Sequence, residues 1–265
     1  MRKLILGVLT LVVVAIVAEL GVAAYTEHRI SRTLRESAEL EADPHVILRG
    51  FPVLPDIISG KYSKIDIQAQ RVSTDYAGRV SLEAALVGAE ITPSAWYQRR
   101  ITALHADELT GRVIMNQTEL GQTFNIPDLR LSFFPPGIID AFGTATQDEL
   151  NLHRPVMMTA TVPESTTNEP VTVEARLYLD GHELEVRPLR YYNGPERDRE
   201  IPIPEELQDE VLRSFGMTIT IPDVPFGLTP AVAYPQGGRI VVESTVANVT
   251  LDLDHRRASV GAANQ

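Results

Sequence analysis

Side chains that could perform acid–base or metal chemistry are scattered along this sequence of 265 residues. No two of its six histidines lie within one helical turn or two strand positions of each other, so a paired-histidine metal motif is absent. The clearest carboxylate pair is Asp252 and Asp254, which share one side of a predicted strand. Such a pair fits a glycosidase or a cation site, but it fits a solvated strand face better. A hydrolase that uses this pair, or histidines that meet in space, is therefore the third of three hypotheses.

The composition excludes several other classes of chemistry. The sequence contains no cysteine, which removes thiol nucleophiles, thiolate zinc sites, iron–sulfur clusters and disulfide bonds. It has 24 Lys and Arg against 35 Asp and Glu, and this net charge of -11 provides no positive field for nucleic acid. We therefore expect no nucleic-acid partner, no catalytic residue, no metal and no cofactor.

The unusual residues are apolar side chains in three segments whose Pro and Gly content is typical of loops. These segments are 51–54, 132–139 and 221–228. They either pack as core at the ends of a sheet or border an apolar cavity that holds acyl chains. Burial of one acyl methylene contributes about 0.8 kcal/mol, so a groove that holds about ten of them binds strongly without a catalytic group. The predicted lipid-binding residues are Phe51, Leu54, Ile57, Ile58, Phe133, Phe134, Phe215 and Phe226.

The N-terminus is typical of an export segment. Two basic residues precede an apolar run over 4–18, and after Glu19 the run continues to Ala24. The segment fits a signal peptide cleaved after Ala24 and equally fits an uncleaved transmembrane anchor, and both place the rest of the chain outside the cytoplasm. We expect residues 1–25 to be this signal peptide or signal anchor, and residues 26–265 to form a single lipid-binding domain.

The elements that position these segments are mainly strands. Alternating apolar and polar residues predict strands over 62–72, 80–91, 108–115, 156–162, 171–179, 183–189, 217–221 and 239–254. Asp180-Gly181 and Gly237-Gly238 are typical of tight hairpin turns, so the strands are expected to pair antiparallel. Helices are predicted over 27–40, 55–59, 93–100, 119–124, 136–142 and 204–215, the second of them ended by Gly60. The antiparallel sheet must therefore be covered mostly by itself or by a few amphipathic helices.

Two blocks of the sequence resemble a known family. The first runs from Gly50-Phe-Pro-Val-Leu through Ile57-Ile-Ser-Gly-Lys-Tyr to Ile65-Asp-Ile, and the second contains Pro225-Phe-Gly-Leu and the strand from Gly237 to Leu251. Together with the export segment, they resemble the LmeA-type phospholipid-binding proteins of actinobacteria. The resemblance implies an α+β fold in which a long curved antiparallel sheet wraps around an amphipathic helix. This arrangement is similar to the tubular lipid-binding folds and is preceded by an N-terminal membrane segment.

The resemblance also implies a function. It implies a non-enzymatic cell-envelope protein that binds membrane phospholipids, with inositol phospholipids and their mannosylated forms as ligands, and supports lipomannan synthesis. We expect acyl chains to enter an apolar groove at the membrane, while Lys61, Lys64 or Arg130 acts only locally, because the net charge is negative. The alternative is an adaptor that stabilises a membrane glycosyltransferase, its partner, through protein contact.

Overall fold

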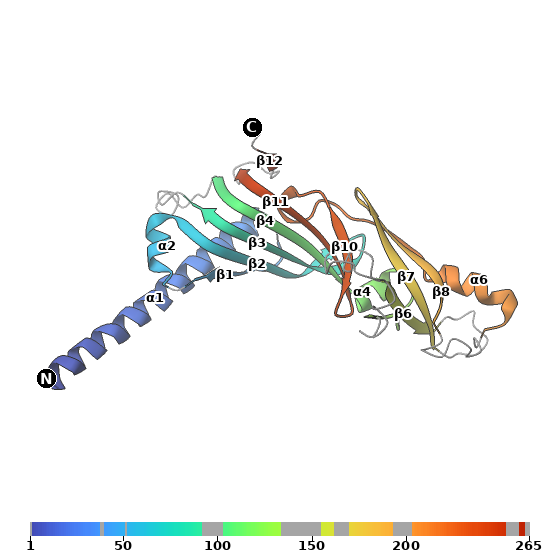
Figure 1. Cartoon of the computed structure of the whole chain (residues 1–265), viewed down its shortest axis with the longest axis horizontal. Helices are drawn as coiled ribbons and strands as arrows, with labels where there is room; N and C mark the ends of the chain where they lie inside the picture. The colour runs from blue at the N-terminus through green and yellow to red at the C-terminus, as the bar shows by residue number, and fades with distance from the viewer. Residues whose placement is uncertain are drawn as a thin grey trace, which may run out of the picture. The chain divides into compact units, whose positions relative to one another are not determined.

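A computed structural model describes residues 2–37, 40–50, 52–91, 103–133, 155–161, 170–192, 203–252 and 260–262 of the chain (Figure 1). The chain forms two compact units. Unit 1 comprises Met1–Gln70, Glu83–Gly111 and Thr245–Gln265, and unit 2 comprises Arg71–Leu82 and Arg112–Ser244. Several long strands contribute residues to both units, and the single domain expected from residue 26 onward stays a prediction.

The larger sheet has seven strands in the order β1-β2-β3-β4-β11-β10, with β12 paired to β11. The pairs β1–β2, β10–β11 and β11–β12 are antiparallel. The strands are β1 (His45–Arg49), β2 (Lys61–Thr74), β3 (Gly78–Glu90), β4 (Ala103–Asn116), β10 (Val232–Gln236), β11 (Arg239–Asp252) and β12 (Val260–Ala262).

The second sheet has five strands, all paired antiparallel in the order β5-β6-β7-β8-β9, and lies in unit 2. Its strands are β5 (Arg130–Phe133), β6 (Val156–Thr161), β7 (Pro170–Asp180), β8 (Glu183–Tyr191) and β9 (Met217–Thr220). One face is apolar and buried, because alternate residues such as Val173, Val186 and Ile219 point to the same side. Helix α6 (Glu205–Ser214) packs on β8 and buries Val211.

The eight strands predicted from alternation are confirmed, as are the two hairpin turns. Four further strands, β1, β5, β10 and β12, were not predicted, and for two of them the sequence gives the reason. In β1 the apolar residues Val46, Ile47 and Leu48 are consecutive, so no alternation is visible. The strand β10 contains Pro235, and proline is a signal against a strand interior. The predicted helices over 93–100 and 136–142 lie outside the described residues.

Three residues inside the long strands adopt positive φ, namely Arg71 at 58°, Gly88 at 61° and Asn248 at 50°. Positive φ within a strand is typical of a β-bulge, which bends the strand and shifts the side-chain alternation by one position. In β3 the buried residues are accordingly Ala84 and Leu86 before Gly88, and Ala89 after it. In β3 this shift keeps apolar residues buried on both sides of Gly88, along a strand that curves in Figure 1.

Helix α1 (Arg2–Ser37) is continuous through the predicted export segment and the predicted helix that follows it. Figure 1 shows its N-terminal half extending away from the strands, while its second half contacts β1. The side chains of Thr26, Ile30 and Ser31 in this second half are buried. Among the residues that the structure describes, no helix combines the length and apolarity needed to cross a membrane. The N-terminal membrane segment stays a prediction. A second short helix, α4 (Gln117–Thr123), follows β4 directly.

Candidate functional site

Glu19, the one charged residue that interrupts the N-terminal apolar run, is only 7% exposed. Its Oε1 accepts hydrogen bonds from the backbone N–H groups of Val53 and Leu54, the latter at 2.8 Å. These groups begin helix α2 (Leu54–Ser59), whose N-cap residue supplies no side-chain hydrogen bond. The first N–H groups of a helix lack partners within the helix, and a carboxylate there also interacts favourably with the helix dipole. Glu19 therefore caps α2 from another helix and joins α1 to α2.

Two further polar contacts hold α1 against the same unit. Glu27 accepts a hydrogen bond from the Leu48 backbone N–H of β1 at 2.9 Å. The hydroxyl of Ser31 donates to the Pro44 carbonyl oxygen at 2.6 Å. Together with the contact at Glu19, these hydrogen bonds hold α1 to α2, to β1 and to the residue before β1.

Helix α2 exposes apolar side chains. Ile58 is 70% exposed and Leu54 is 40% exposed, while Ile57 is half-buried. The helix ends at Gly60, whose φ of 74° and N–H bond to Asp56 form the left-handed stop predicted from the sequence. Apolar residues of α1 within five positions of Glu19 in the sequence are also exposed, on more than one side of the helix. We call the exposed apolar residues of both helices the α1–α2 apolar surface, and they are Val14, Ile16, Val17, Leu20, Leu54 and Ile58.

The strands of unit 1 present a continuous apolar face. Its residues alternate with polar ones such as Lys64 and Asp66, and each is at most 8% exposed. They are Ile65, Ala69, Ala84, Leu86, Ala89, Leu104, Ala106, Leu109, Val249 and Leu251. Unit 1 thus combines an enclosed apolar face on long curved strands with an exposed apolar surface on α1 and α2.

The predicted lipid-binding residues are distributed over both units. Leu54, Ile57 and Ile58 lie together on α2 of unit 1. Phe215 in unit 2 is fully buried after α6, and Phe226 is half-buried in the 3₁₀ turn η2 (Pro225–Gly227). The other three predicted residues lie outside the described part, since nothing is described of Phe51, of Phe134 or of the Phe133 side chain.

The basic residues expected near a headgroup are partly neutralised. Lys61 forms an ion pair with Glu90 at 2.7 Å, which raises the pKa of Lys61 through their hydrogen bond. Lys64 lies 3.4 Å from the Asp66 carboxylate, which also binds Arg49. Arg130 is exposed on β5. Any effect of these two lysines on a headgroup is therefore local, since a carboxylate lies beside each of them.

The described residues do not assemble the site of the hydrolase hypothesis. Asp254 and the Asp252 side chain lie outside the described part. His105 contacts Thr250 at 3.2 Å in unit 1, whereas His182 contacts the Ile221 carbonyl oxygen at 3.0 Å in unit 2. Within the described residues, no three His, Asp or Glu side chains form a group that could hold a metal ion.

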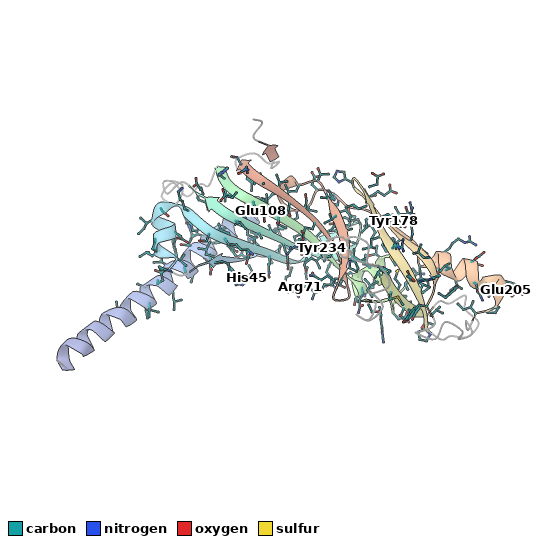
Figure 2. The ribbon with its side chains drawn as sticks, in the orientation of Figure 1. His45, Arg71, Glu108, Tyr178, Glu205 and Tyr234 are labelled. Atoms are coloured by element: carbon teal, nitrogen blue, oxygen red, sulfur yellow. The ribbon has the colours of Figure 1, made fainter. Side chains whose placement is uncertain are left out.

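Unit 2 contains a tyrosine whose titration couples to folding. The Tyr234 hydroxyl, labelled in Figure 2, donates to Glu243 Oε2 at 2.8 Å, and Arg112 binds the same oxygen. Burial, followed by the hydrogen bond to Glu243, raises the pKa of Tyr234 from 10.0 to about 12. A raised folded-state pKa means that the protonated form stabilises the fold. This contribution is complete below pH 10 and is lost as the pH rises through 12.

We therefore expect the free energy of unfolding in urea to fall between pH 10 and 12, and Tyr234→Phe to reduce this fall. The fall should not vanish, because burial also raises the pKa values of Tyr76 and Tyr191. Urea titrations of both proteins at several pH values measure the difference. A Tyr234→Phe protein whose stability falls as steeply as that of the wild type would show that this proton is not coupled to folding.

Exposed apolar residues on α1 and α2, in the same unit as an apolar face on long antiparallel strands, fit a class of protein that binds apolar ligands. A comparison with protein-family models matches residues 17–245 to the family described as LmeA-like phospholipid-binding. The chain belongs to this LmeA-like phospholipid-binding family, which confirms the resemblance seen in the two sequence blocks. No curated protein and no solved structure matches the chain.

Proposed function

We propose that this protein is a non-enzymatic phospholipid-binding protein of the cell envelope that holds acyl chains in an apolar groove and supports lipomannan synthesis. The observation that carries the proposal is the exposed apolar side of α2, a helix that Glu19 joins to α1 in the same unit as the enclosed apolar face. Family membership supports phospholipid as the ligand class. The resemblance of the two sequence blocks supports inositol phospholipids and their mannosylated forms as the particular ligands.

The mechanism is partition of acyl chains between the bilayer and the protein. Leu54 and Ile58 form the first apolar contact for an acyl chain, because they are the most exposed apolar residues of α2. The chain then lies against the apolar face of the unit 1 strands. Each buried methylene contributes about 0.8 kcal/mol, so binding needs no reactive side chain. Near α2 the paired charges of Lys61 and Glu90 give the headgroup little attraction.

The proposed location is the outer face of the cytoplasmic membrane, with α1 as an uncleaved anchor. Glu19 precedes Ala24, so cleavage after Ala24 would remove the carboxylate that caps α2. The retained contacts of α1 with α2 and β1 therefore favour an anchor over a cleaved signal peptide. The two basic residues before the apolar run favour the cytoplasm for the N-terminus and the extracytoplasmic side for the body.

The substitution Ile58→Asp tests the role of α2. Because Ile58 is 70% exposed, the variant should fold like the wild type. Loss of the apolar side chain and gain of a charge should weaken phospholipid uptake from vesicles about tenfold or more. Transfer of a fluorescent phospholipid from vesicles to the protein measures this effect.

The matched control is Val87→Asp, which introduces the same charge at an exposed apolar position on β3 of the same unit. This variant should take up lipid as the wild type does. Equal uptake by the Ile58→Asp protein and the wild type would contradict the assignment of α2 to the lipid site.

The α1–α2 apolar surface also supports a second candidate, the adaptor that stabilises a membrane glycosyltransferase. Exposed apolar residues on two neighbouring helices are typical of protein contacts as well as lipid contacts. If the adaptor proposal is correct, Ile58→Asp should abolish capture of the glycosyltransferase while lipid uptake stays unchanged. Loss of lipid uptake without loss of a captured partner would contradict it.

A further inference from the structure

One face of the β7–β8 hairpin in unit 2 carries opposed arginines. The register places Arg176 directly opposite Arg187, with Tyr178 opposite Glu185 and Glu174 opposite Arg190. Side chains directly opposite each other in an antiparallel pair lie within contact range, and like charges there are destabilising. An arrangement of this kind requires negative charge close to both arginines.

Two of the three arginines on this face have that negative charge. Arg187 donates a hydrogen bond to Glu185, and its guanidinium lies over the Tyr178 ring at 4.5 Å from the centroid. Arg190 donates to the carboxylate of Glu174, which is itself buried, at 2.7 Å. The two glutamates are therefore already engaged by Arg187 and Arg190.

Arg176 has no such partner. Its Nε atom is buried and makes no hydrogen bond, and no described carboxylate lies within ion-pair distance of its guanidinium. The face thus carries three arginines against the two glutamates that pair with Arg187 and Arg190, while Asp180 and Glu183 lie opposite each other at the turn end of the hairpin. A buried donor without an acceptor is costly, so an anionic acceptor that reaches Arg176 would be bound favourably.

We propose that Arg176 and Arg187 form a subsite for a phosphate group on the outer face of the β7–β8 hairpin. A guanidinium presents planar pairs of N–H donors that match phosphate oxygens, and two opposed guanidinium groups can share one phosphate. Tyr178, labelled in Figure 2, stacks on Arg187 and restricts its orientation. The phosphate relieves the repulsion between the two arginines and accepts hydrogen bonds from the terminal N–H groups of Arg176, whose Nε is buried.

The subsite explains how a chain of net charge -11 can bind an anion. Long-range attraction is unfavourable, but direct contact with two arginines is screened little by salt once water is displaced. The subsite itself rests on unit 2 alone, whereas a phospholipid headgroup as the source of the phosphate rests on the proposed function. Free phosphate is the other source of the same chemistry.

The test uses the full chain in uncharged detergent, titrated with inorganic phosphate by isothermal titration calorimetry. Arg176→Gln removes the charge and should weaken phosphate binding about tenfold, which corresponds to about 1.4 kcal/mol. Arg239→Gln makes the same charge change at an exposed position on β11 of unit 2 and should leave the affinity within about twofold. Equal affinities of Arg176→Gln and the wild type, or no saturable binding by the wild type, would overturn the proposal.

Competition with vesicles identifies the source of the phosphate. If phosphatidylinositol vesicles displace inorganic phosphate from the wild type, the subsite takes a lipid headgroup; if they do not, it takes free phosphate. Both results are consistent with phosphate binding at the subsite. The proposed function is tested separately, because a wild-type protein that binds phosphate but takes up no lipid would overturn that function alone. Lipid uptake retained by Arg176→Gln, with phosphate binding lost, would support both the subsite and the separate acyl site.

Discussion

Replacement of Phe215 by alanine should lower the free energy of unfolding of unit 2 by about 3–5 kcal/mol. Phe215 lies between α6 and β9, is 0% exposed and is among the largest fully buried side chains. The variant loses the transfer free energy of the ring and leaves a cavity that the surrounding sheet cannot close. Because domains are stable by only about 5–15 kcal/mol, this is a large share of the total. Urea unfolding followed by circular dichroism measures it.

The control for this prediction is Phe226→Ala. Phe226 is half-buried in the turn η2, so its truncation should cost clearly less than that of Phe215. Measured together, the two variants also show whether each phenylalanine acts in the core or in lipid binding, the role predicted for both from the sequence. A Phe215→Ala protein that is as stable as the wild type but binds less lipid would make Phe215 a ligand contact instead of a core residue.

Glu19→Ala should release α2 from α1. The substitution removes the acceptor of two backbone N–H groups, one of them the buried N–H of Val53. Donors left without a partner cost about 1–3 kcal/mol, so amide exchange at the start of α2 should accelerate about tenfold or more. Hydrogen–deuterium exchange of the peptide that contains α2, read by mass spectrometry, measures the change.

Two further variants make this result specific. Glu19→Gln keeps an oxygen acceptor and should accelerate exchange less than Glu19→Ala does. Glu27→Ala removes the acceptor of Leu48 on β1, so it should affect exchange in β1 and not in α2. If α2 exchanges at the wild-type rate in Glu19→Ala, the carboxylate does not hold the two helices together.

The sheets were predictable because each has one buried face. Alternation along residues such as Ile65, Ile67 and Ala69 reports that face directly, and it identified eight strands. The positive φ at Gly88 and Asn248 was not predicted, because it depends on strand pairing, and a one-residue shift of the alternation does not by itself specify the backbone conformation. The opposed arginines at 176 and 187 were hidden for the same reason, since only the register of β7 with β8 places them together.

The candidate site was predictable in part. Pro55 and Gly60 correctly marked the limits of α2, and its apolar residues were assigned to the site. Whether an apolar residue lies in the core or on the surface was not readable, since Ile58 and Phe215 have similar chemistry but opposite exposure. Glu19 was visible only as an interruption of the apolar run, and its partner lies 35 residues away along the chain. Such a long-range contact has no signal in local sequence.

Native mass spectrometry of the full chain tests phospholipid binding most directly. The protein is purified from a lipid-rich host and released from detergent micelles before its mass is measured. We predict a mass that includes a stoichiometric phospholipid, identified after extraction, and a lower bound fraction for Ile58→Asp. The protein mass should also retain residues 1–24, as expected for an uncleaved anchor. A lipid-free mass that takes up no phospholipid from phosphatidylinositol vesicles would contradict the account and would favour the adaptor.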